Sequence, residues 1–235
     1  MKLLRIIFLS GLMAMALLLS ASPGQVNASP IFDFNMDANH PATASLSYAG
    51  GAAPLIGKDI SVDFVQLVGD PLSQRNISGG ILAFTTGNLT GSDATRWFFG
   101  GGGTITLKGG VDLNNDGDYT DPEDIPVGST LFSGQFNTAT VTTFDGQKLL
   151  GALFTDTKIE KLTSYYGLPG GPTNFYGGFI NLSFDAVGSP PAAFTDTDLL
   201  SGDITNKIPE PTALILFGSG LLGAALYRRL RKPKG

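Results

Sequence analysis

Residues 60–64 read Ile-Ser-Val-Asp-Phe, a stretch in which apolar and polar residues alternate without exception. Side chains along a β-strand point to opposite faces in turn, so this pattern predicts a strand with one buried side and one solvent-facing side. The alternation slips between Val65 and Val68, and a β-bulge there would absorb the extra residue. The stretch therefore favours an antiparallel sheet with a core on one face.

The rest of the central region has the same character. Short runs of β-branched and aromatic residues are separated by Gly, Asn, Asp and Pro, and the chain holds 32 glycines, which disfavours regular helix. We expect further strands over 81–85, 96–99, 104–108, 130–144, 148–154 and 175–186. No stretch supplies the helical crossovers of a doubly wound α/β fold. The predicted class is therefore all-β, an antiparallel β-sandwich of jelly-roll type.

One short helix is predicted over 158–166. Thr157 and Glu160 fit a capping box, in which the hydroxyl and the carboxylate satisfy opposite backbone amides. Gly167 and Pro169 then provide a stop signal. We expect this helix to pack on the sheet.

Composition excludes several kinds of site. The chain has 15 Lys and Arg, 20 Asp and Glu, one His and no Cys. Disulfides, thiolate metal sites and cysteine nucleophiles are excluded, and so is any site that needs two imidazoles. Seven of the basic residues lie near the two ends, so the acidic excess is concentrated in 29–208. Such a body repels nucleic acid and favours cations, and we expect no nucleic-acid partner.

An acidic segment carries the clearest chemistry. Residues 112–123 read Asp-Leu-Asn-Asn-Asp-Gly-Asp-Tyr-Thr-Asp-Pro-Glu and satisfy the pattern D-x-[DN]-x-[DN]-G-x₅-E in full. Alternate side chains of such a loop turn inward, the glycine permits a sharp turn, and the last carboxylate chelates with both oxygens. The predicted Ca²⁺ ligands are Asp112, Asn114, Asp116, Asp118 (through its backbone carbonyl) and Glu123.

This segment resembles the calcium loops of EF-hand and dockerin proteins. Its flanks differ from a helical EF-hand, because 104–110 is strand-like and Pro122 and Pro126 oppose a long helix. We therefore expect a structural Ca²⁺ in a loop that joins two strands, without a sensor-type switch. The alternative is an acidic, solvated turn that binds no specific ion.

Signals for catalysis are missing. No G-x-S-x-G nucleophile motif occurs, and sequence alone cannot pair two acids across a sugar. The aromatic runs 97–99, 165–166 and 175–176 would serve as sugar-stacking platforms if they are exposed, or as core residues if they are buried. We predict that the protein is not an enzyme. A carbohydrate-binding module and a polysaccharide-acting enzyme remain alternatives.

The N-terminus has the features of a secretory signal peptide over 1–28. Lys2 and Arg5 precede an apolar run over 6–19, and Val26-Asn27-Ala28 places short residues at the −3 and −1 positions of a cleavage site. Signal peptidase is therefore an expected partner, and it would cut after Ala28.

The C-terminus has three parts in a fixed order. Pro209-Glu210-Pro211 is followed by an uncharged, glycine-containing stretch over 212–227 and then by Arg228 and Arg229. An uncharged stretch of this length is just short of the roughly 30 Å hydrocarbon core, and snorkelling arginines would make up the difference. We expect a transmembrane helix over 212–227, with its basic end in the cytoplasm.

This tail resembles the PEP-CTERM sorting signal of Gram-negative bacteria. The resemblance implies recognition by an exosortase at the inner membrane, cleavage near Pro209-Glu210-Pro211, and delivery to the cell surface or to an exopolysaccharide matrix. We accordingly predict a signal peptide over 1–28, a β-sandwich body over 29–186, a spacer over 187–208 and a sorting signal over 209–235. The expected role in the biofilm matrix is structural or adhesive, with exopolysaccharide as a possible partner.

Overall fold

A computed structural model describes residues 31–36 and 43–207 of the chain. The cleavage site at Ala28, the Pro209-Glu210-Pro211 motif, Arg228, Arg229 and the helix predicted over 212–227 lie outside these residues. No helix within the described ranges is long and apolar enough to cross a membrane. The elements, in chain order, are β1 (Ile31–Met36), β2 (Ser45–Tyr48), β3 (Pro54–Ser61), β4 (Phe64–Leu67), β5 (Asp70–Ser92), β6 (Arg96–Phe99), β7 (Gly102–Val111), β8 (Ile125–Phe144), β9 (Gln147–Lys158), α2 (Glu160–Tyr165), β10 (Tyr176–Phe184), β11 (Phe194–Asp196) and β12 (Leu199–Lys207).

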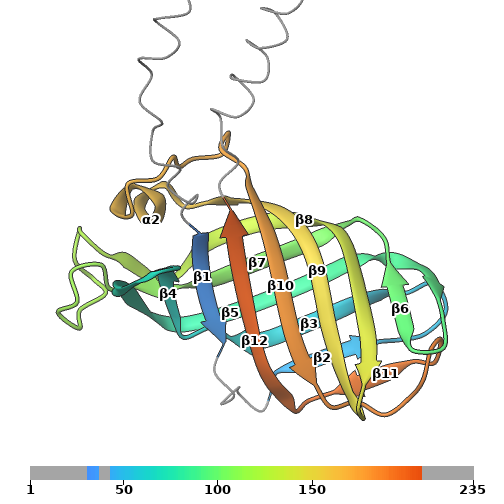
Figure 1. Ribbon diagram of the computed structural model, residues 1–235. Coiled ribbons are helices and arrows are strands. Elements are labelled where there is room, and N and C mark those ends of the chain that lie inside the picture. The colour runs from blue at the N-terminus through green and yellow to red at the C-terminus, as the bar shows by residue number, and fades with distance from the viewer. Residues whose placement is uncertain (1–30, 37–42, 208–235) are drawn as a thin grey trace, which may run out of the picture.

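The strands join in one twelve-stranded antiparallel sheet, ordered β11-β2-β3-β5-β4-β1-β12-β10-β9-β8-β6, with β7 paired to both β5 and β8. Figure 1 shows two layers whose strands cross steeply: β1, β12, β10 and β9 run in front, and β7, β5, β3 and β2 run behind. The long strand β8 pairs with β7 of the back layer and with β9 of the front layer, and the short strand β4 joins β5 at the back to β1 at the front. The predicted all-β antiparallel class is confirmed, and the jelly-roll detail stays a prediction.

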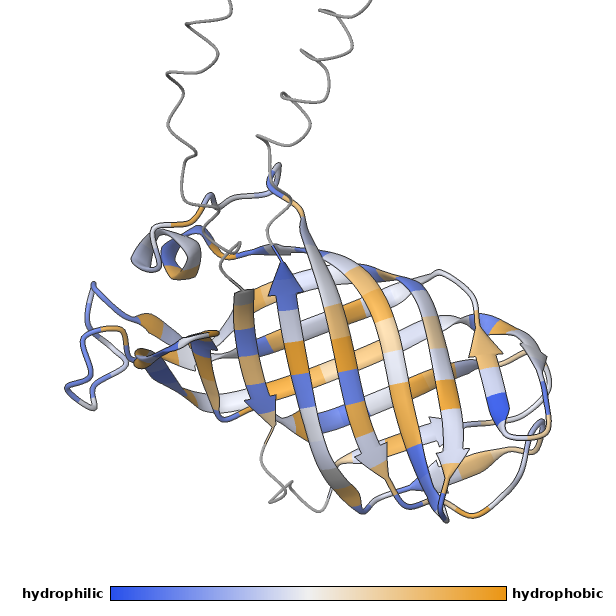
Figure 2. Cartoon of the chain, in the orientation of Figure 1, coloured by the Kyte–Doolittle hydropathy of each residue, from blue (hydrophilic) through white to orange (hydrophobic). Residues whose placement is uncertain are grey.

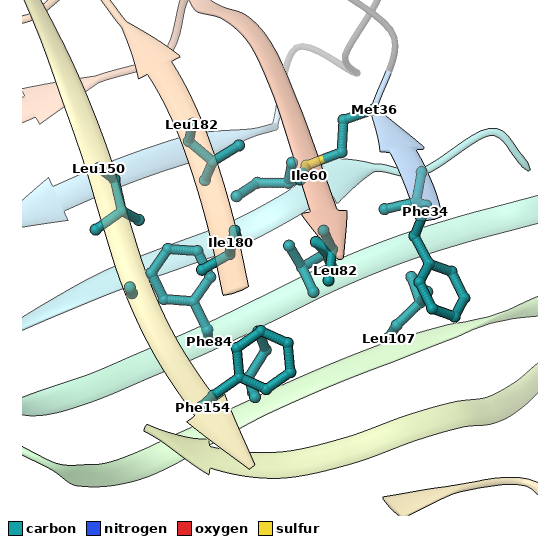
Figure 3. Close-up of a cluster of buried hydrophobic side chains, with 14 of the residues drawn as sticks. Phe34, Met36, Ile60, Leu82, Phe84, Leu107, Leu150, Phe154, Ile180 and Leu182 are labelled. Carbon is teal, nitrogen blue, oxygen red and sulfur yellow. The ribbon is translucent and has the colours of Figure 1, made fainter. Parts of the chain in front are cut away.

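The core fills the space between the two layers. In Figure 3, Leu150, Phe154 and Ile180 from the front layer meet Leu82 and Phe84 from the back layer. All five are at most 3% exposed. Every second residue faces inward along these strands, as in the pattern of β10, so binary patterning decides which side of each strand is buried.

The stretch at 60–64 divides into two strands. β3 ends at Ser61 and β4 begins at Phe64, and between them the Val62 amide donates to the Gly80 carbonyl at 3.0 Å. The Asp63 amide donates instead to the Asn35 carbonyl of β1, also at 3.0 Å. The chain therefore changes partners here. The slip in the alternation after Phe64 coincides with an irregularity in the pairing of β4 with β5 between Val65 and Leu67, where a β-bulge was predicted.

Helix α2 confirms the predicted helix, but the predicted capping box is wrong. Its N-cap is Ile159, with no side-chain capping bond. Thr157 is still part of β9, where it pairs with Ser133 of β8, so its hydroxyl is not positioned to cap the helix. The stop signal is confirmed: Gly167 has φ +68° and its amide donates to the Ser164 carbonyl.

The last two strands lie where a spacer is predicted. β12 is a central strand that pairs along its length with β1 on one side and β10 on the other (Figure 1). Composition rich in Gly, Thr and Asp suggests a linker, but Ile204 and Asn206 of this strand point inward and are fully buried. In contrast to the predicted boundary at 186, the folded body continues to Lys207.

Candidate metal centre

The acidic segment forms a loop at the edge of the molecule. It connects β7 to β8, and the pair Val111–Ile125 closes its base. In Figure 1 it is the green loop that projects to the left, away from the crossing layers. The predicted placement between two strands is therefore found in the structure.

Asp112 organises the first half of the loop. Its side chain is buried, and its Oδ1 accepts hydrogen bonds from the amides of Asn115 at 2.5 Å and Asp116 at 3.2 Å. Its Oδ2 accepts from the Gly117 amide at 2.8 Å. Asn115 and Gly117 have positive φ angles, 64° and 89°, which let the backbone wrap around this carboxylate.

Asn114 and Asp116 face each other beside Asp112. The Asn114 Nδ2 donates to Asp116 Oδ2 at 3.0 Å, and the Asp116 amide donates to Asn114 Oδ1 at 3.0 Å. The Asp118 carboxylate turns outward, because it accepts hydrogen bonds from the amide and the hydroxyl of Thr120. Those two bonds lower the pKa of Asp118. Three of the predicted ligand side chains thus lie together.

The last carboxylate of the cluster comes from a residue that the motif does not include. Asp124 is fully buried, and its Oδ1 accepts from the amides of Leu113 at 2.6 Å and Asn114 at 3.4 Å. Its Oδ2 has no hydrogen-bond partner among the described residues. One carboxylate oxygen each from Asp112, Asp116 and Asp124 lies within 4.8 Å of the others.

Glu123, predicted as the bidentate ligand at the end of the loop, is exposed and is not part of this group. The reason is the register of the sheet. Ile125 pairs with Val111 and begins β8, which turns the side chain before it, Asp124, into the loop. The apolar Ile125 that starts a strand was the signal in the sequence that could have identified Asp124.

The charged form of one carboxyl group of the loop, that of Asp121, is disfavoured. Loss of solvation, followed by the charges of Asp116 and Asp118, raises the pKa of Asp121. The nearest cations bind backbone atoms: Lys161 of α2 donates to the carbonyls of Pro122 and Asp124, and Arg75 donates to the Leu113 carbonyl. Two ion pairs occur within 31–36 and 43–207, and neither involves this loop. An oxygen-rich cluster whose carboxylates form no ion pair with another described residue suits a hard cation such as Ca²⁺.

Trp97 does not provide a sugar-stacking platform, which would need an exposed aromatic ring. This side chain is fully buried, its Nε1–H donates to the Ala192 carbonyl at 3.2 Å, and its ring packs edge-on against Phe194. Tyr176 is buried as well, whereas Tyr165 and Phe175 are partly exposed. Trp97 is therefore a core residue.

Comparison with known proteins identifies the tail. Residues 207–232 match the family model described as the PEP-CTERM protein-sorting motif. This motif defines a class of exported proteins that an exosortase processes after transient anchoring through the C-terminal region. The chain carries that motif. No curated protein and no solved structure matches the chain. The match begins at Lys207, the residue with which β12 ends.

Proposed function

We propose that this protein is a non-catalytic component of the cell surface or extracellular matrix of a Gram-negative bacterium, with a structural or adhesive role in exopolysaccharide. The observation that carries the proposal is the sorting motif at 207–232, which follows the last strand of the body without a spacer. In this proposal, signal peptidase removes residues 1–28 and exosortase acts near Pro209-Glu210-Pro211 at the inner membrane. The body is then released or transferred.

Replacing Pro209, Glu210 and Pro211 by Ala in the native host tests the sorting step. The substituted protein should stay in the membrane fraction at its unprocessed size, while the parent protein reaches the surface or the medium. The conservative variant Glu123→Gln, which changes an exposed side chain of the body, should be sorted like the parent. Equal export of the triple variant and the parent would contradict exosortase sorting.

A structural Ca²⁺ in the loop over 112–124 is the second part of the proposal. It is supported by the carboxylate group of Asp112, Asp116 and Asp124 and by the unpartnered, buried Oδ2 of Asp124. An ion there would neutralise the cluster and fix the connection between β7 and β8. Affinity in the range of extracellular modules, roughly 10⁻⁴ to 10⁻³ M, would suffice where calcium is abundant.

Calcium titration with a thermal melt tests the ion site. The melting temperature of the parent should rise with calcium, and that rise should vanish in the double variant Asp112→Ala, Asp116→Ala. Magnesium at the same concentration is the control, because it demands a stricter octahedral geometry. A parent protein that does not respond to calcium would reduce the loop to a solvated turn.

Carbohydrate binding is a second candidate, favoured by one feature of the outer face of the front layer. Phe179 of β10 is 41% exposed there, beside a shallow hollow lined by polar residues that include Asn181, Ser183 and Asp203. Figure 2 shows that this face mixes apolar and polar strand positions. An aromatic face beside hydroxyl and carboxyl groups suits a sugar ring. Binding to matrix polysaccharides that is lost in Phe179→Ala would establish this function, and absence of binding would exclude it.

The non-enzymatic part of the proposal is tested at the same face. Asp203 of β12 lines that hollow, and its neighbour Asp33 of β1 contributes to the raised pKa of its carboxyl group. We expect no polysaccharide turnover by the purified protein. Hydrolysis that disappears in Asp203→Asn would overturn the proposal and establish the polysaccharide-acting enzyme instead.

A further inference from the structure

Three polar residues meet inside the apolar core, far in sequence from the acidic loop. The inward-facing positions of β9 end in Asp156 and Lys158, which are 1% and 3% exposed, and Asn206 of β12 is fully buried. β9 and β12 lie on either side of β10, as Figure 1 shows. Asn206 pairs with Gly178 on β10, so no side chain from that position stands between the two outer strands.

The carboxyl group of Asp156 connects the other two residues. Its Oδ2 forms an ion pair with the Nζ of Lys158, and its Oδ1 accepts a hydrogen bond from the Nδ2 of Asn206 at 2.7 Å. The Oδ1 of Asn206 has no partner among the residues that the structure describes. One acid thus touches both an amine and a carboxamide, while the carbonyl oxygen of the carboxamide is unsatisfied.

Four aromatic rings enclose the amine. The Nζ of Lys158 lies 4.6 Å from the ring centroid of Tyr176, 5.1 Å from that of Phe132, and 5.6 Å from those of both Phe32 and Phe34. Tyr176 comes from β10, Phe132 from β8, and the other two from β1. This enclosure keeps bulk water from the amine and from its partners.

Burial shifts both ionisable groups towards their neutral forms. Loss of solvation lowers the pKa of Lys158 to about 8 and raises the pKa of Asp156. Tyr176 is the other titratable group that faces them, and burial raises its pKa to about 12, so it stays protonated. A neutral amine is a nucleophile, and a protonated carboxyl group is a general acid.

We propose that Lys158 and Asn206 become joined by an intramolecular isopeptide bond, with Asp156 as the group that carries the proton. The arrangement provides a nucleophile and an electrophilic carboxamide on either side of one acid that contacts both, inside a dry site. Holding reacting groups in place in this way removes much of the entropic barrier to their reaction.

The reaction balances without any oxidant or further reactant. The neutral Nζ of Lys158 attacks Cγ of Asn206, and the new C–N bond forms as the Cγ–Nδ2 bond breaks. The carboxyl proton of Asp156 goes to the departing Nδ2, which leaves as ammonia. The same carboxylate then takes one proton from Nζ, so Asp156 ends protonated, as it began. The product is a secondary amide plus one molecule of ammonia.

The unsatisfied carbonyl oxygen of Asn206 favours the proposed cross-link over an unreacted buried ion pair. A buried polar atom without a partner costs about 1–3 kcal/mol, and a buried ion pair alone contributes little to stability. In the product, the protonated Asp156 donates to the carbonyl oxygen of the new amide, which satisfies that atom. The bond also removes the ammonium charge from the core.

Peptide mapping of the full chain, purified in detergent after expression, tests the proposal directly. Lys158, Lys161 and Lys207 are the only trypsin sites over 149–207. Trypsin does not cleave after an acylated lysine, so the digest should contain 149–161 joined to 162–207. The joined species should be lighter than the sum of its two peptides by about 17 Da, the mass of ammonia. Tandem spectra should locate the link at Lys158 and Asn206.

Variants identify the role of each group. Asn206→Ala removes the electrophile and should yield only unlinked peptides. Asp156→Asn keeps both bond-forming residues but cannot carry the proton, and it should also abolish the link. Asn181→Ala, on the outer face of β10, should stay linked. Unlinked 149–158 in the parent digest would overturn the proposal, whether or not the variants fold. A loss of about 18 Da at Lys158 and Asp156 would overturn it too, since water would then be the leaving group.

Discussion

The loop over 112–124 and the cluster of Lys158, Asp156 and Asn206 both gather carboxyl and amide groups, but they are built in opposite ways. The loop takes its ligands from one contiguous segment at the edge of the molecule, and its backbone amides donate hydrogen bonds to the Asp112 carboxylate. The core cluster takes its members from two strands that are separated by about fifty residues and joined only through β10. Local spacing specifies the first site, whereas the register of the sheet specifies the second.

The largest effect should come from breaking the core cluster. Asn206→Ala should lower the melting temperature by roughly 10 °C, because a cross-link that closes a loop of this size restricts the unfolded chain by about 4 kcal/mol. Differential scanning calorimetry of the parent and the variant provides the measurement. Asn181→Ala is the matched control, since it also shortens an asparagine of the front layer. Equal melting temperatures for Asn206→Ala and the control would show that the cluster carries no cross-link and little stability.

An intermediate effect should come from the loop. At calcium concentrations of ten to a hundred times the dissociation constant, ion binding should stabilise the parent by about 1.4–2.7 kcal/mol, a rise of several degrees in melting temperature. Asp124→Asn should lose this rise, because it removes the buried, unpartnered carboxylate oxygen. Glu123→Gln should keep it. The reverse outcome, with Glu123 essential and Asp124 dispensable, would show that Glu123 is the last Ca²⁺ ligand, as the sequence motif predicts.

The smallest effect should come from the outer face, which belongs to neither region. Burial, with the hydrogen bond and charge of Asp33, raises the pKa of Asp203 to about 7 from an ordinary value of 3.8. The folded state then binds more protons than the unfolded chain between these two pH values, so stability should fall as pH rises through that window. Asp203→Asn should flatten the profile and raise the melting temperature by about 2–3 °C at pH 8. A profile equally steep in both proteins would contradict the raised pKa.

The sequence predicts the features that depend on local residues better than those that depend on tertiary pairing. Alternation and turn residues were enough to predict the all-β class, the helix and the loop between two strands, because each depends on neighbours within a few residues. Asp124 was missed because its orientation depends on the pairing of Ile125 with Val111 across the loop. The capping box was wrong because the tertiary pairing of Thr157 with Ser133 extends β9 to Lys158.

The core cluster had no sequence signal of its own. Lys158 and Asp156 fit the polar side of a strand as well as the buried side. Near Asn206 the signal is weak, because Ile204, which shares its strand face, is the single apolar residue over 201–207. Only the register of β12 against β10, with Asn206 opposite Gly178, shows that the three meet. The composition of 187–208 was misleading as well, because its last part, which resembles a linker, forms the central strand β12.

The position of β12 decides how the body bears mechanical load. Its last residue, Lys207, is also the first residue of the sorting motif, so any pull transmitted from the tail enters the body along this strand. β12 is bonded on both sides, to β1 and β10, and tension along its axis must shear both ladders together instead of unzipping one pair at a time. Asn206 is the residue immediately inside the point of entry. A covalent link at that position would pass the tension to β9 before either ladder is stretched.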